Sequence, residues 1–334
     1  MSTDARRLLP TIAVDAMGGD NAPDAVVAGA IVAHRDRLGK IVLVGDGARI
    51  EPLLHGETGI EIVHSAGLVA MDASASQAVR KAEGTSLGDA VDLVRDGRAA
   101  AVVSAGNSGA FLAIALIRLR TIPGIARPAI GAVLPGADGP VVLCDAGANV
   151  DCKPEWLVQF GVMGAAYARA ALGIAEPRVG LVSVGEEPTK GNAQVLEAAA
   201  LFARAPVRFI GNVEGKDVLH NHADVVVADG FVGNVILKTA EGSATFVRDV
   251  IREAYENAGV VGKLGGLLSR GVFASIRVRV DYSTYGGAPL LGVRGNCVVA
   301  HGRSDKVAIR NAIRQAAALA DADLVRTIGA VLAA

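Results

Sequence analysis

The sequence has few of the features that mark secreted, membrane-spanning or nucleic-acid-binding proteins. Its three cysteines lack the paired spacing of a zinc site, and their odd number argues against a disulfide framework, which indicates a reducing cytosol. The longest apolar run, residues 109–117, is too short to cross a membrane and stops at Arg118. The first residues include Asp4 and no apolar stretch of signal-peptide length. A net charge of −1 gives no electrostatic reason to expect nucleic acid as a partner.

Aromatic residues are also scarce, at 4% of the chain, although 51% of its residues are hydrophobic. Glycine, with 41 residues, and small aliphatic side chains dominate, a composition that suits helices packed closely on a sheet. The apolar excess must therefore fill a large core, an interface between subunits or a contact with a membrane surface.

Short apolar segments alternate with helix-like segments along the chain. The predicted strands are residues 12–15, 41–44, 60–64, 100–104, 141–145, 179–184, 207–210 and 225–228. The clearest predicted helices are residues 24–35, 87–95, 109–118, 153–172 and 234–256. Pro123, Pro128 and Pro135 indicate a less regular segment between them.

This alternation predicts an α/β fold with a mostly parallel, doubly wound sheet. Ligands of such sheets bind beyond the carboxyl ends of the strands. We therefore expect the glycine-rich turns that follow the strands to converge on one crevice.

The first of these turns, DAMGGDNAP at residues 15–23, joins a buried strand to a helix. Gly18 and Gly19 allow positive φ and a close approach of the backbone to a ligand. Asn21 and Pro23 signal the start of a helix, whose free N–H groups attract anions. The turn is thus a candidate phosphate cradle, or else a tight connection without a ligand. Related turns after later strands favour the cradle.

The standard nucleotide and hydrolase motifs are absent from the sequence. It has no G-x-G-x-x-G after the first strand and no Walker A loop, and residues 106–109 are one residue short of the hydrolase elbow. Asp15 with Asp20 could hold Mg²⁺, but turn hydrogen bonding is the favoured role for both. His220 and His222 have no evident third ligand. We therefore expect neither a metal nor a cofactor.

Two polar loops contain side chains that could take part in chemistry. Lys190 lies in a loop after a predicted strand and could neutralise a phosphate or a developing oxyanion, or it could be a solvated surface lysine. Asn234 follows another predicted strand and could hydrogen-bond a carbonyl or cap the following helix. The residues alone leave both pairs of alternatives open.

Six motifs occur in a fixed order along the chain. They are DAMGGD (15–20), SAGNSGA (104–110), DAGAN (145–149), KGN (190–192), DGFVGN (229–234) and DYSTYGGAPLLG (281–292). In these motifs, and over about residues 11–320, the chain resembles the bacterial phosphate acyltransferase (PlsX) family of phospholipid synthesis.

The resemblance implies a three-layer α/β/α fold like that of isocitrate and isopropylmalate dehydrogenases, and a homodimer. It implies transfer of a long-chain fatty acyl group from acyl carrier protein to inorganic phosphate, giving acyl phosphate for a membrane glycerol-3-phosphate acyltransferase. The alternative is a short-chain phosphotransacetylase that acts on acyl-CoA. Residues 1–10 are then an N-terminal extension, 11–320 one catalytic domain with an amphipathic helical insertion near 258–280, and 321–334 a helical tail.

Resemblance and chemistry together assign the site. Lys190 is expected to neutralise phosphate or the oxyanion, and Asn234 to polarise the thioester carbonyl. The residues expected to position substrate and phosphate are Asp15, Gly18, Gly19, Asp20, Asn21, Gly106, Asn107, Ser108, Asn149 and Gly233.

Residues 258–280 have the pattern of a basic amphipathic helix. Leu264, Leu268 and Val272 fall four residues apart, which places them on one side of a helix. On the other side, every seventh residue is basic: these are Lys263, Arg270 and Arg277. The apolar stripe could contact a membrane or the other subunit, and the basic side chains could bind acidic carrier protein or be solvated. The resemblance implies a cytoplasmic protein that associates peripherally with the inner face of the cell membrane.

Overall fold

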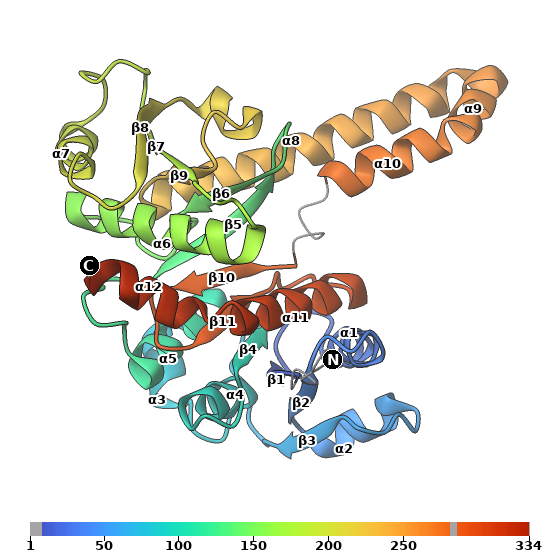
Figure 1. Ribbon diagram of the computed structural model, residues 1–334. Helices are drawn as coiled ribbons and strands as arrows, with labels where there is room; N and C mark the ends of the chain where they lie inside the picture. The colour runs from blue at the N-terminus through green and yellow to red at the C-terminus, as the bar shows by residue number, and fades with distance from the viewer. Residues whose placement is uncertain (1–8, 281–285, 334) are drawn as a thin grey trace, which may run out of the picture.

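The computed structural model describes residues 9–280 and 286–333, and these form a mixed sheet of 11 strands flanked by helices (Figure 1). In chain order the strands are β1 (Thr11–Asp15), β2 (Lys40–Gly45), β3 (Glu61–His64), β4 (Ala101–Ser104), β5 (Ala129–Pro135), β6 (Pro140–Cys144), β7 (Arg178–Val182), β8 (Arg208–Val213), β9 (Val225–Val227), β10 (Ala288–Leu291) and β11 (Asn296–Val299). They lie across the sheet in the order β3-β2-β1-β4-β11-β10-β5-β6-β9-β7-β8. The predicted α/β fold is confirmed, and each predicted strand is present.

The sequence pattern missed three strands, β5, β10 and β11, that together occupy the middle of the sheet. The expectation of an irregular segment after Pro123 was wrong, because β5 runs from Ala129 to Pro135. Its prolines lie just before the strand and at its last residue, where a missing backbone N–H costs little.

The middle of the sheet reverses the direction of the strands. β10 pairs antiparallel with both β11 and β5, and β5 pairs antiparallel with β6, whereas the other neighbours are parallel. The half that contains β1, β4 and β11 therefore runs opposite to the half that contains β6, β9 and β7. Among the described strands, five adjacent ones are parallel in the first half (β3-β2-β1-β4-β11) and four in the second (β6-β9-β7-β8).

Helices cover both faces of this sheet. They are α1 (Asp24–Arg35), α2 (Gly47–Ile50), α3 (Ala75–Arg80), α4 (Ser86–Arg95), α5 (Ser108–Leu119), α6 (Pro154–Leu172), α7 (Ala193–Phe202), α8 (Gly230–Asn257), α9 (Gly259–Leu268), α10 (Arg270–Val280), α11 (Lys306–Asp321) and α12 (Leu324–Ala333), with 3-10 turns η1 (Glu51–Leu54) and η2 (Gly215–His220). One face carries α1, α11, α12, α6 and α7, which pack against one another. The other carries α3, α4, α5 and the start of α8. This arrangement confirms the three-layer prediction.

Alternate residues of the strands fill two different core layers. In β1, Ile12 and Val14 pack on the side of α1 and α11, whereas Ala13 packs on the side of α4 and α5. All three are almost completely buried. Burying a side chain as large as Ile12 or Val14 contributes about 1.5–3 kcal/mol, so apolar strands of this kind are stable only in the centre of such layers.

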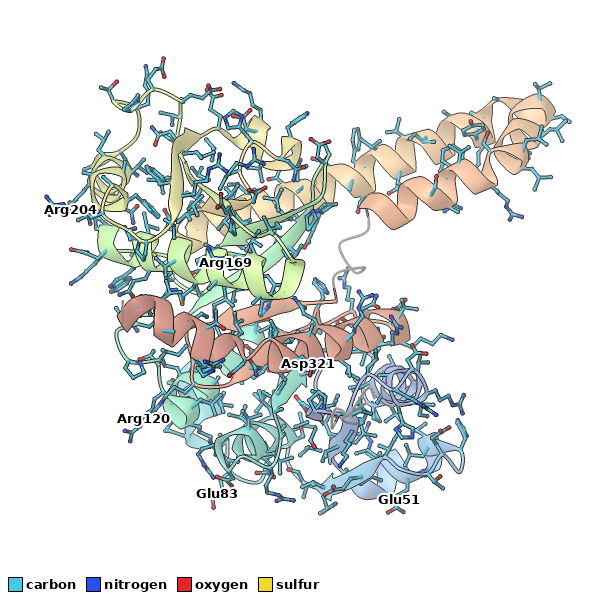
Figure 2. All side chains as sticks on the ribbon, in the orientation of Figure 1. Glu51, Glu83, Arg120, Arg169, Arg204 and Asp321 are labelled. Atoms are coloured by element: carbon cyan, nitrogen blue, oxygen red, sulfur yellow. The ribbon has the colours of Figure 1, made fainter. Side chains whose placement is uncertain are left out.

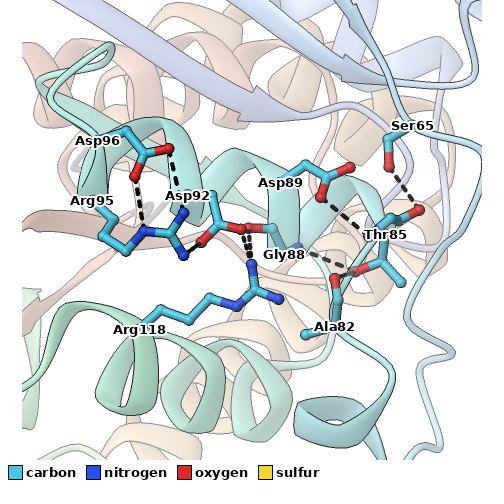
Figure 3. A network of polar contacts seen from close by, with 10 residues as sticks. Ser65, Ala82, Thr85, Gly88, Asp89, Asp92, Arg95, Asp96 and Arg118 are labelled. Carbon is cyan, nitrogen blue, oxygen red and sulfur yellow. Dashed lines mark hydrogen bonds and ion pairs between the residues drawn. The ribbon is translucent and has the colours of Figure 1, made fainter.

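A network of charged groups joins α4 to α5 (Figure 3). Arg118, the residue that ends the longest apolar run, forms an ion pair with Asp92 and donates to the carbonyl oxygen of Gly88 at 3.3 Å. Arg95 reaches the same carboxylate at 2.5 Å. The hydroxyl of Thr85 caps α4 by accepting from the Gly88 N–H at 3.2 Å. A charged residue on the apolar helix α5 is thereby stabilised by a structural ion pair.

The last two thirds of α8, with α9 and α10, form an arm that projects from the body (Figure 1). α8 has 28 residues and is therefore about 42 Å long. α10 returns alongside it, and the rings of Tyr255 and Phe273 meet edge-on with centroids 5.4 Å apart. The expected single amphipathic helix is wrong in one respect: α9 ends at Leu268 and the chain turns at Ser269 into α10, so Val272 does not continue the stripe of α9.

Candidate functional site

The loops that follow β1, β4 and β11 form one cluster at one edge of the sheet, which we call the first loop cluster. At its base lies the buried carboxylate of Asp15, which accepts from Ser104 Oγ at 2.7 Å and from the Met17 N–H at 3.2 Å. The Gly106 N–H donates to Ser104 Oγ at 3.0 Å. A Cβ on Gly18 would lie 2.4 Å from Asp15 Oδ2 and 2.9 Å from the Gly106 nitrogen. These glycines therefore allow two turns to pack over a carboxylate of the protein itself.

Burial raises the pKa of the Asp15 carboxyl, and hydrogen bonds from neighbours such as Ser104 and Met17 oppose that shift. The N–H groups of Met17 and Gly106 are already bonded to protein acceptors. Much of the donor capacity of this cradle is therefore used inside the protein.

The outer part of the first loop cluster is also tied to its neighbours. Gly19 has φ of +114°, and the next residue, Asp20, donates its N–H to the Gly302 carbonyl oxygen at 2.8 Å. Asn21 Nδ2 donates to the carbonyl oxygen of Arg303 at 3.3 Å. Both Asp20 and Asn21 are exposed. These contacts join the turn after β1 to the turn after β11.

Asn107 begins α5, because its side-chain oxygen accepts from the Ala110 N–H at 2.9 Å. Its Nδ2 donates to the carbonyl oxygens of Met71 and Ala73, at 2.8 and 2.9 Å. Ser108 is the exposed first residue of the helix. Asn107 is thus a helix cap that also holds the loop after β3.

The loops that follow β6, β7 and β9 form the second loop cluster. Its base is Asp145, which is completely buried and accepts N–H bonds from Ile130 at 2.9 Å and from each of residues 147–149 at 2.7–3.2 Å. Asn149 Nδ2 donates to Asp145 at 2.9 Å and to the Pro128 carbonyl oxygen at 2.8 Å. Burial raises the pKa of Asp145, against the effect of these donors. Asn149 therefore holds the loop in shape through its side chain.

Asn234 lies in the second turn of α8 with its side chain exposed. It does not cap the helix, because Asp229 does so by accepting from the Val232 N–H at 2.8 Å. A Cβ on Gly233 would lie 1.9 Å from the Asp145 carbonyl oxygen, and one on Gly147 would lie 3.5 Å from the Asn234 side chain. The two glycines let α8 approach the loop after β6 closely and leave the Asn234 amide at the surface of the cluster.

Lys190 lies in the loop after β7 and is exposed. Its N–H donates to the Glu187 carbonyl oxygen at 3.0 Å, and Asn212 Nδ2 donates to the carbonyl oxygens of Glu187 and Lys190 at 2.9 and 3.2 Å. A Cβ on Gly185 would lie 3.0 Å from Lys190 Cγ. The backbone of this lysine is therefore fixed, and no ion pair holds its ammonium group among the residues described.

The three loops of the second cluster are joined to one another. The Gly230 N–H donates to the Asn149 carbonyl oxygen at 2.7 Å, which links the loops after β9 and β6. Gln194 Nε2, at the start of α7, donates to the Cys152 carbonyl oxygen at 2.6 Å. This bond joins the end of the loop after β7 to the loop after β6. Lys190 and Asn234 therefore lie on neighbouring loops of one connected surface.

The predicted site residues do not converge on one crevice of the single chain. Asp15, Gly18, Gly19, Asp20, Asn21, Gly106, Asn107 and Ser108 lie in the first loop cluster, whereas Asn149, Lys190, Gly233 and Asn234 lie in the second. Because the halves of the sheet are antiparallel, the clusters lie at opposite edges, and β1 is five strand spacings, roughly 24 Å, from β6. The expectation of one crevice was wrong, since the central strands that reverse the sheet were not predicted.

The side chains that build these loops were not predicted from the sequence. Ser104 and Asp145 were quoted as parts of motifs but were given no role, and Asn212 and Gln194 were not singled out. A polar residue directly at the end of a buried strand was the available signal for the first two.

Within residues 9–280 and 286–333, no group of three or more His, Cys, Asp or Glu side chains is arranged to hold a metal ion. In the same residues, no helix is both long and apolar enough to cross a membrane.

Comparison with known proteins identifies the class of fold. The chain superposes on a phosphotransacetylase from Streptococcus pyogenes with a TM-score of 0.65 and 18% identity, covering 94% of each chain. A putative 4-hydroxythreonine-4-phosphate dehydrogenase from Salmonella typhimurium gives 0.55 and 12%, covering 93% of this chain and 99% of the other. The fold is therefore the α/β fold of these enzymes.

Sequence comparison is more specific. A family model described as fatty acid synthesis protein matches residues 10–327. A phosphate acyltransferase from Myxococcus xanthus is 47% identical over 329 residues, which are 95% of this chain and 93% of the relative. One from Desulforudis audaxviator is 48% identical over 318 residues, covering 95% and 94%. The chain belongs to the phosphate acyltransferase (PlsX) family, whose enzymes act in fatty acid and phospholipid synthesis.

Proposed function

We propose that the enzyme transfers a long-chain fatty acyl group from acyl carrier protein to inorganic phosphate, with Lys190 and Asn234 at the centre of the reaction. The observation that carries this assignment is the second loop cluster, where an ammonium group on the loop after β7 and an amide on the first turns of α8, after the adjacent strand β9, are both exposed. The names of the relatives support phosphate as the acyl acceptor.

The chemistry needs electrostatic stabilisation more than an acid. A phosphate oxygen attacks the thioester carbonyl carbon, the new C–O bond forms, and the C–S bond then breaks as the carbonyl is restored. The thiolate leaves and takes a proton from solvent. Lys190 Nζ neutralises the phosphate and the oxyanion, and Asn234 Nδ2 donates a hydrogen bond to the carbonyl oxygen as its charge grows.

This mechanism uses direct transfer without an acyl-cysteine. Burial raises the pKa of the Cys152 thiol to about 11, so it is a neutral, weak nucleophile near pH 7. The Cys144 thiol is completely buried. Asn149 and Gly233 would shape the pocket around phosphate, and the role of the first loop cluster in positioning phosphate stays a prediction.

A comparison of substrates tests this function. Purified enzyme is given phosphate and either long-chain acyl carrier protein or acetyl-CoA, and acyl phosphate is trapped with hydroxylamine. We expect product from the long-chain carrier substrate and at least a hundredfold lower rate with acetyl-CoA. A preference for acetyl-CoA would identify a short-chain phosphotransacetylase instead.

We also propose that the arm serves a homodimer and the membrane surface. Phe246, Val250, Val247 and Ile251 form an exposed apolar stripe on α8, which suits a second copy of the chain. At the far end, Val260, Val261 and Leu268 of α9 are 84%, 83% and 79% exposed. Apolar groups at such a tip suit a lipid surface, where a greasy acyl phosphate must reach a membrane glycerol-3-phosphate acyltransferase.

The exposed side chains of α9 and α10 agree with a surface role, since Lys263, Leu264, Arg270 and Val272 are all exposed. Arg277 lies on α10, but its side chain is outside what the structure describes. We expect Leu268→Glu to release the protein from anionic vesicles while dimerisation and activity in solution persist. If Leu268→Glu instead separates the subunits, α9 belongs to the interface between subunits and the membrane proposal fails.

A further inference from the structure

A cationic and aromatic surface lies beside the second loop cluster, on the connection between α5 and β5 and the start of α6. The guanidinium of Arg127 lies over the ring of Trp156, 5.2 Å from its centroid. Arg127 and Lys153 are exposed, and Lys153 immediately precedes α6. The contact with the ring restricts the guanidinium, which is still exposed and can bind a carboxylate or phosphate.

The connection is held rigidly on α6. Gln159 accepts from the Ala126 N–H at 2.9 Å and donates to the Gly124 carbonyl oxygen at 2.9 Å. Ile125 between them is buried. Arg127 is thus presented by an ordered loop, so little conformational freedom is lost when a partner binds.

The surface is continuous with the proposed site. Pro128, the residue after Arg127, accepts from Asn149 Nδ2 at 2.8 Å, and Asn149 in turn accepts from the Gly230 N–H at the start of α8. The backbone next to Arg127 is therefore joined by one hydrogen bond to the loop after β6, and that loop is joined by a second to the start of α8, the helix that carries Asn234.

The cations of this surface outnumber its carboxylates. Residues 119–128, 151–156 and 292–295 contain four cations, Arg120, Arg127, Lys153 and Arg294, and two carboxylates, Asp151 and Glu155. All six side chains are exposed, and the four cations form no ion pair among the described residues. Elsewhere many arginines do, as Arg178 does with Asp224 at 2.9 Å. Unpaired arginines beside a tryptophan are typical of a surface that binds a partner.

We infer that Arg127, Trp156 and Lys153 form the docking surface for the acidic carrier protein that delivers the acyl thioester. This inference rests on the proposed function. A carrier with a strongly acidic face complements the cations, and docking here brings its thioester arm to Lys190 and Asn234 on the neighbouring loops. The arm residues Lys263 and Arg270, expected to bind the carrier from sequence, lie at the far end of α8 and away from these loops.

The test compares charge reversals at the two ends of one helix. Arg127→Glu and Lys153→Glu alter the surface beside the site, and Arg169→Glu makes the same change near the other end of α6, where Figure 2 labels it. Each variant is assayed with long-chain acyl carrier protein and with the same acyl group on pantetheine alone, at low and high salt.

We expect Arg127→Glu and Lys153→Glu each to lower kcat/KM for the carrier substrate at least tenfold, through KM, and to reduce its dependence on salt. The pantetheine substrate and Arg169→Glu should be unaffected. Equal losses on both substrates would mean that the substitution has damaged the site. Arg127→Gln then serves as the milder variant: it removes the charge without reversing it, and the inference requires that it also raise the KM for the carrier substrate.

Two outcomes would overturn the inference while leaving the proposed function intact. The first is wild-type carrier kinetics for Arg127→Glu, and the second is a selective loss for Arg270→Glu on the arm. If the wild-type enzyme itself fails to use acyl carrier protein, the proposed function fails, and this result is distinguishable from both.

Discussion

The two loop clusters are built alike but present different chemistry. Each has a buried aspartate at the end of a strand, Asp15 or Asp145, that holds the following turn by its backbone N–H groups. In each, a glycine brings a second turn into close contact. At the surface of the first cluster lie the carboxylate of Asp20, the amide of Asn21 and the guanidinium of Arg303, whereas the second exposes Lys190 and Asn234.

The difference shows that a glycine-rich turn after a strand is a structural device before it is a ligand site. In both clusters the backbone donors chiefly bind an aspartate of the protein, so the turns alone cannot identify the phosphate site. Each cluster exposes an amide and a cation, Asn21 with Arg303 in the first and Asn234 with Lys190 in the second, so substitutions must show which pair stabilises the oxyanion. The following predictions test this comparison.

The largest effect is expected when the exposed lysine of the second cluster is removed. Lys190→Ala should lower the rate of acyl phosphate formation by about two to three orders of magnitude, the usual loss for one electrostatic stabiliser. Lys306→Ala removes another exposed lysine, at the start of α11 beside the first cluster, and should be nearly neutral. Steady-state kinetics measures the rates of both variants, and circular dichroism checks that both are folded. Equal rates for the two variants would remove Lys190 from the mechanism.

Asn234→Ala should lower the rate about a hundredfold while the free energy of unfolding hardly changes, because the side chain is exposed and caps nothing. Asp229→Ala, which removes the actual cap of α8, should instead cost about 1 kcal/mol of stability. Denaturant unfolding and turnover are measured on both variants. Loss of stability in Asn234→Ala would show that its role is structural.

Adding a methyl group to the close-packed glycines should destabilise both clusters. Gly18→Ala and Gly233→Ala should each cost about 1–3 kcal/mol, since their Cβ atoms would lie 2.4 and 1.9 Å from protein oxygens. Only Gly233→Ala should also slow turnover of the folded enzyme, because it displaces Asn234.

Gly242→Ala is the matched control for this pair. It lies on the same helix as Gly233 with nothing within 4 Å of its Cβ position, and should stabilise the protein by about 0.5–1 kcal/mol. Thermal unfolding measures all three variants. A raised phosphate KM in Gly18→Ala would assign phosphate positioning to the first cluster, as the family resemblance implies.

The smallest effect concerns the pH dependence of stability. The pKa of Asp15 is raised in the folded protein, so the folded state holds this proton more tightly than the unfolded chain. Its contribution to the free energy of unfolding therefore falls as pH rises from 3.8 to the raised value, and is constant above it. Asp15→Asn should remove this fall, whereas Asp20→Asn, at an exposed carboxyl of the same turn, should keep it. Urea unfolding between pH 4 and 7 measures the free energy of unfolding of each variant. If this free energy changes with pH in Asp15→Asn as it does in the wild type, the prediction is contradicted.

Much of the local structure was readable from the sequence. Residues 24–35 were predicted as a helix and form α1 with the same bounds, because its apolar face is regular and its neighbours are polar. The start signal was less reliable: Asn21 does not cap α1 but bonds to the backbone of Arg303, which lies 282 residues away in the chain. A distant acceptor of this kind leaves no trace in local pattern.

The sequence by itself determined the alternation of strands and helices, the family motifs and the candidate residues Lys190 and Asn234, because these depend on nearby residues. Only the tertiary structure decided which motifs lie together. β10 lies between β11 and β5, and its pairing with β5 joins residues more than 150 positions apart in the chain. Because β10 is antiparallel to both neighbours and β5 is antiparallel to β6, the loops after β1 and β6 lie at opposite edges. Strand direction is set by backbone pairing across the sheet, and side-chain pattern within a four-residue strand does not record it.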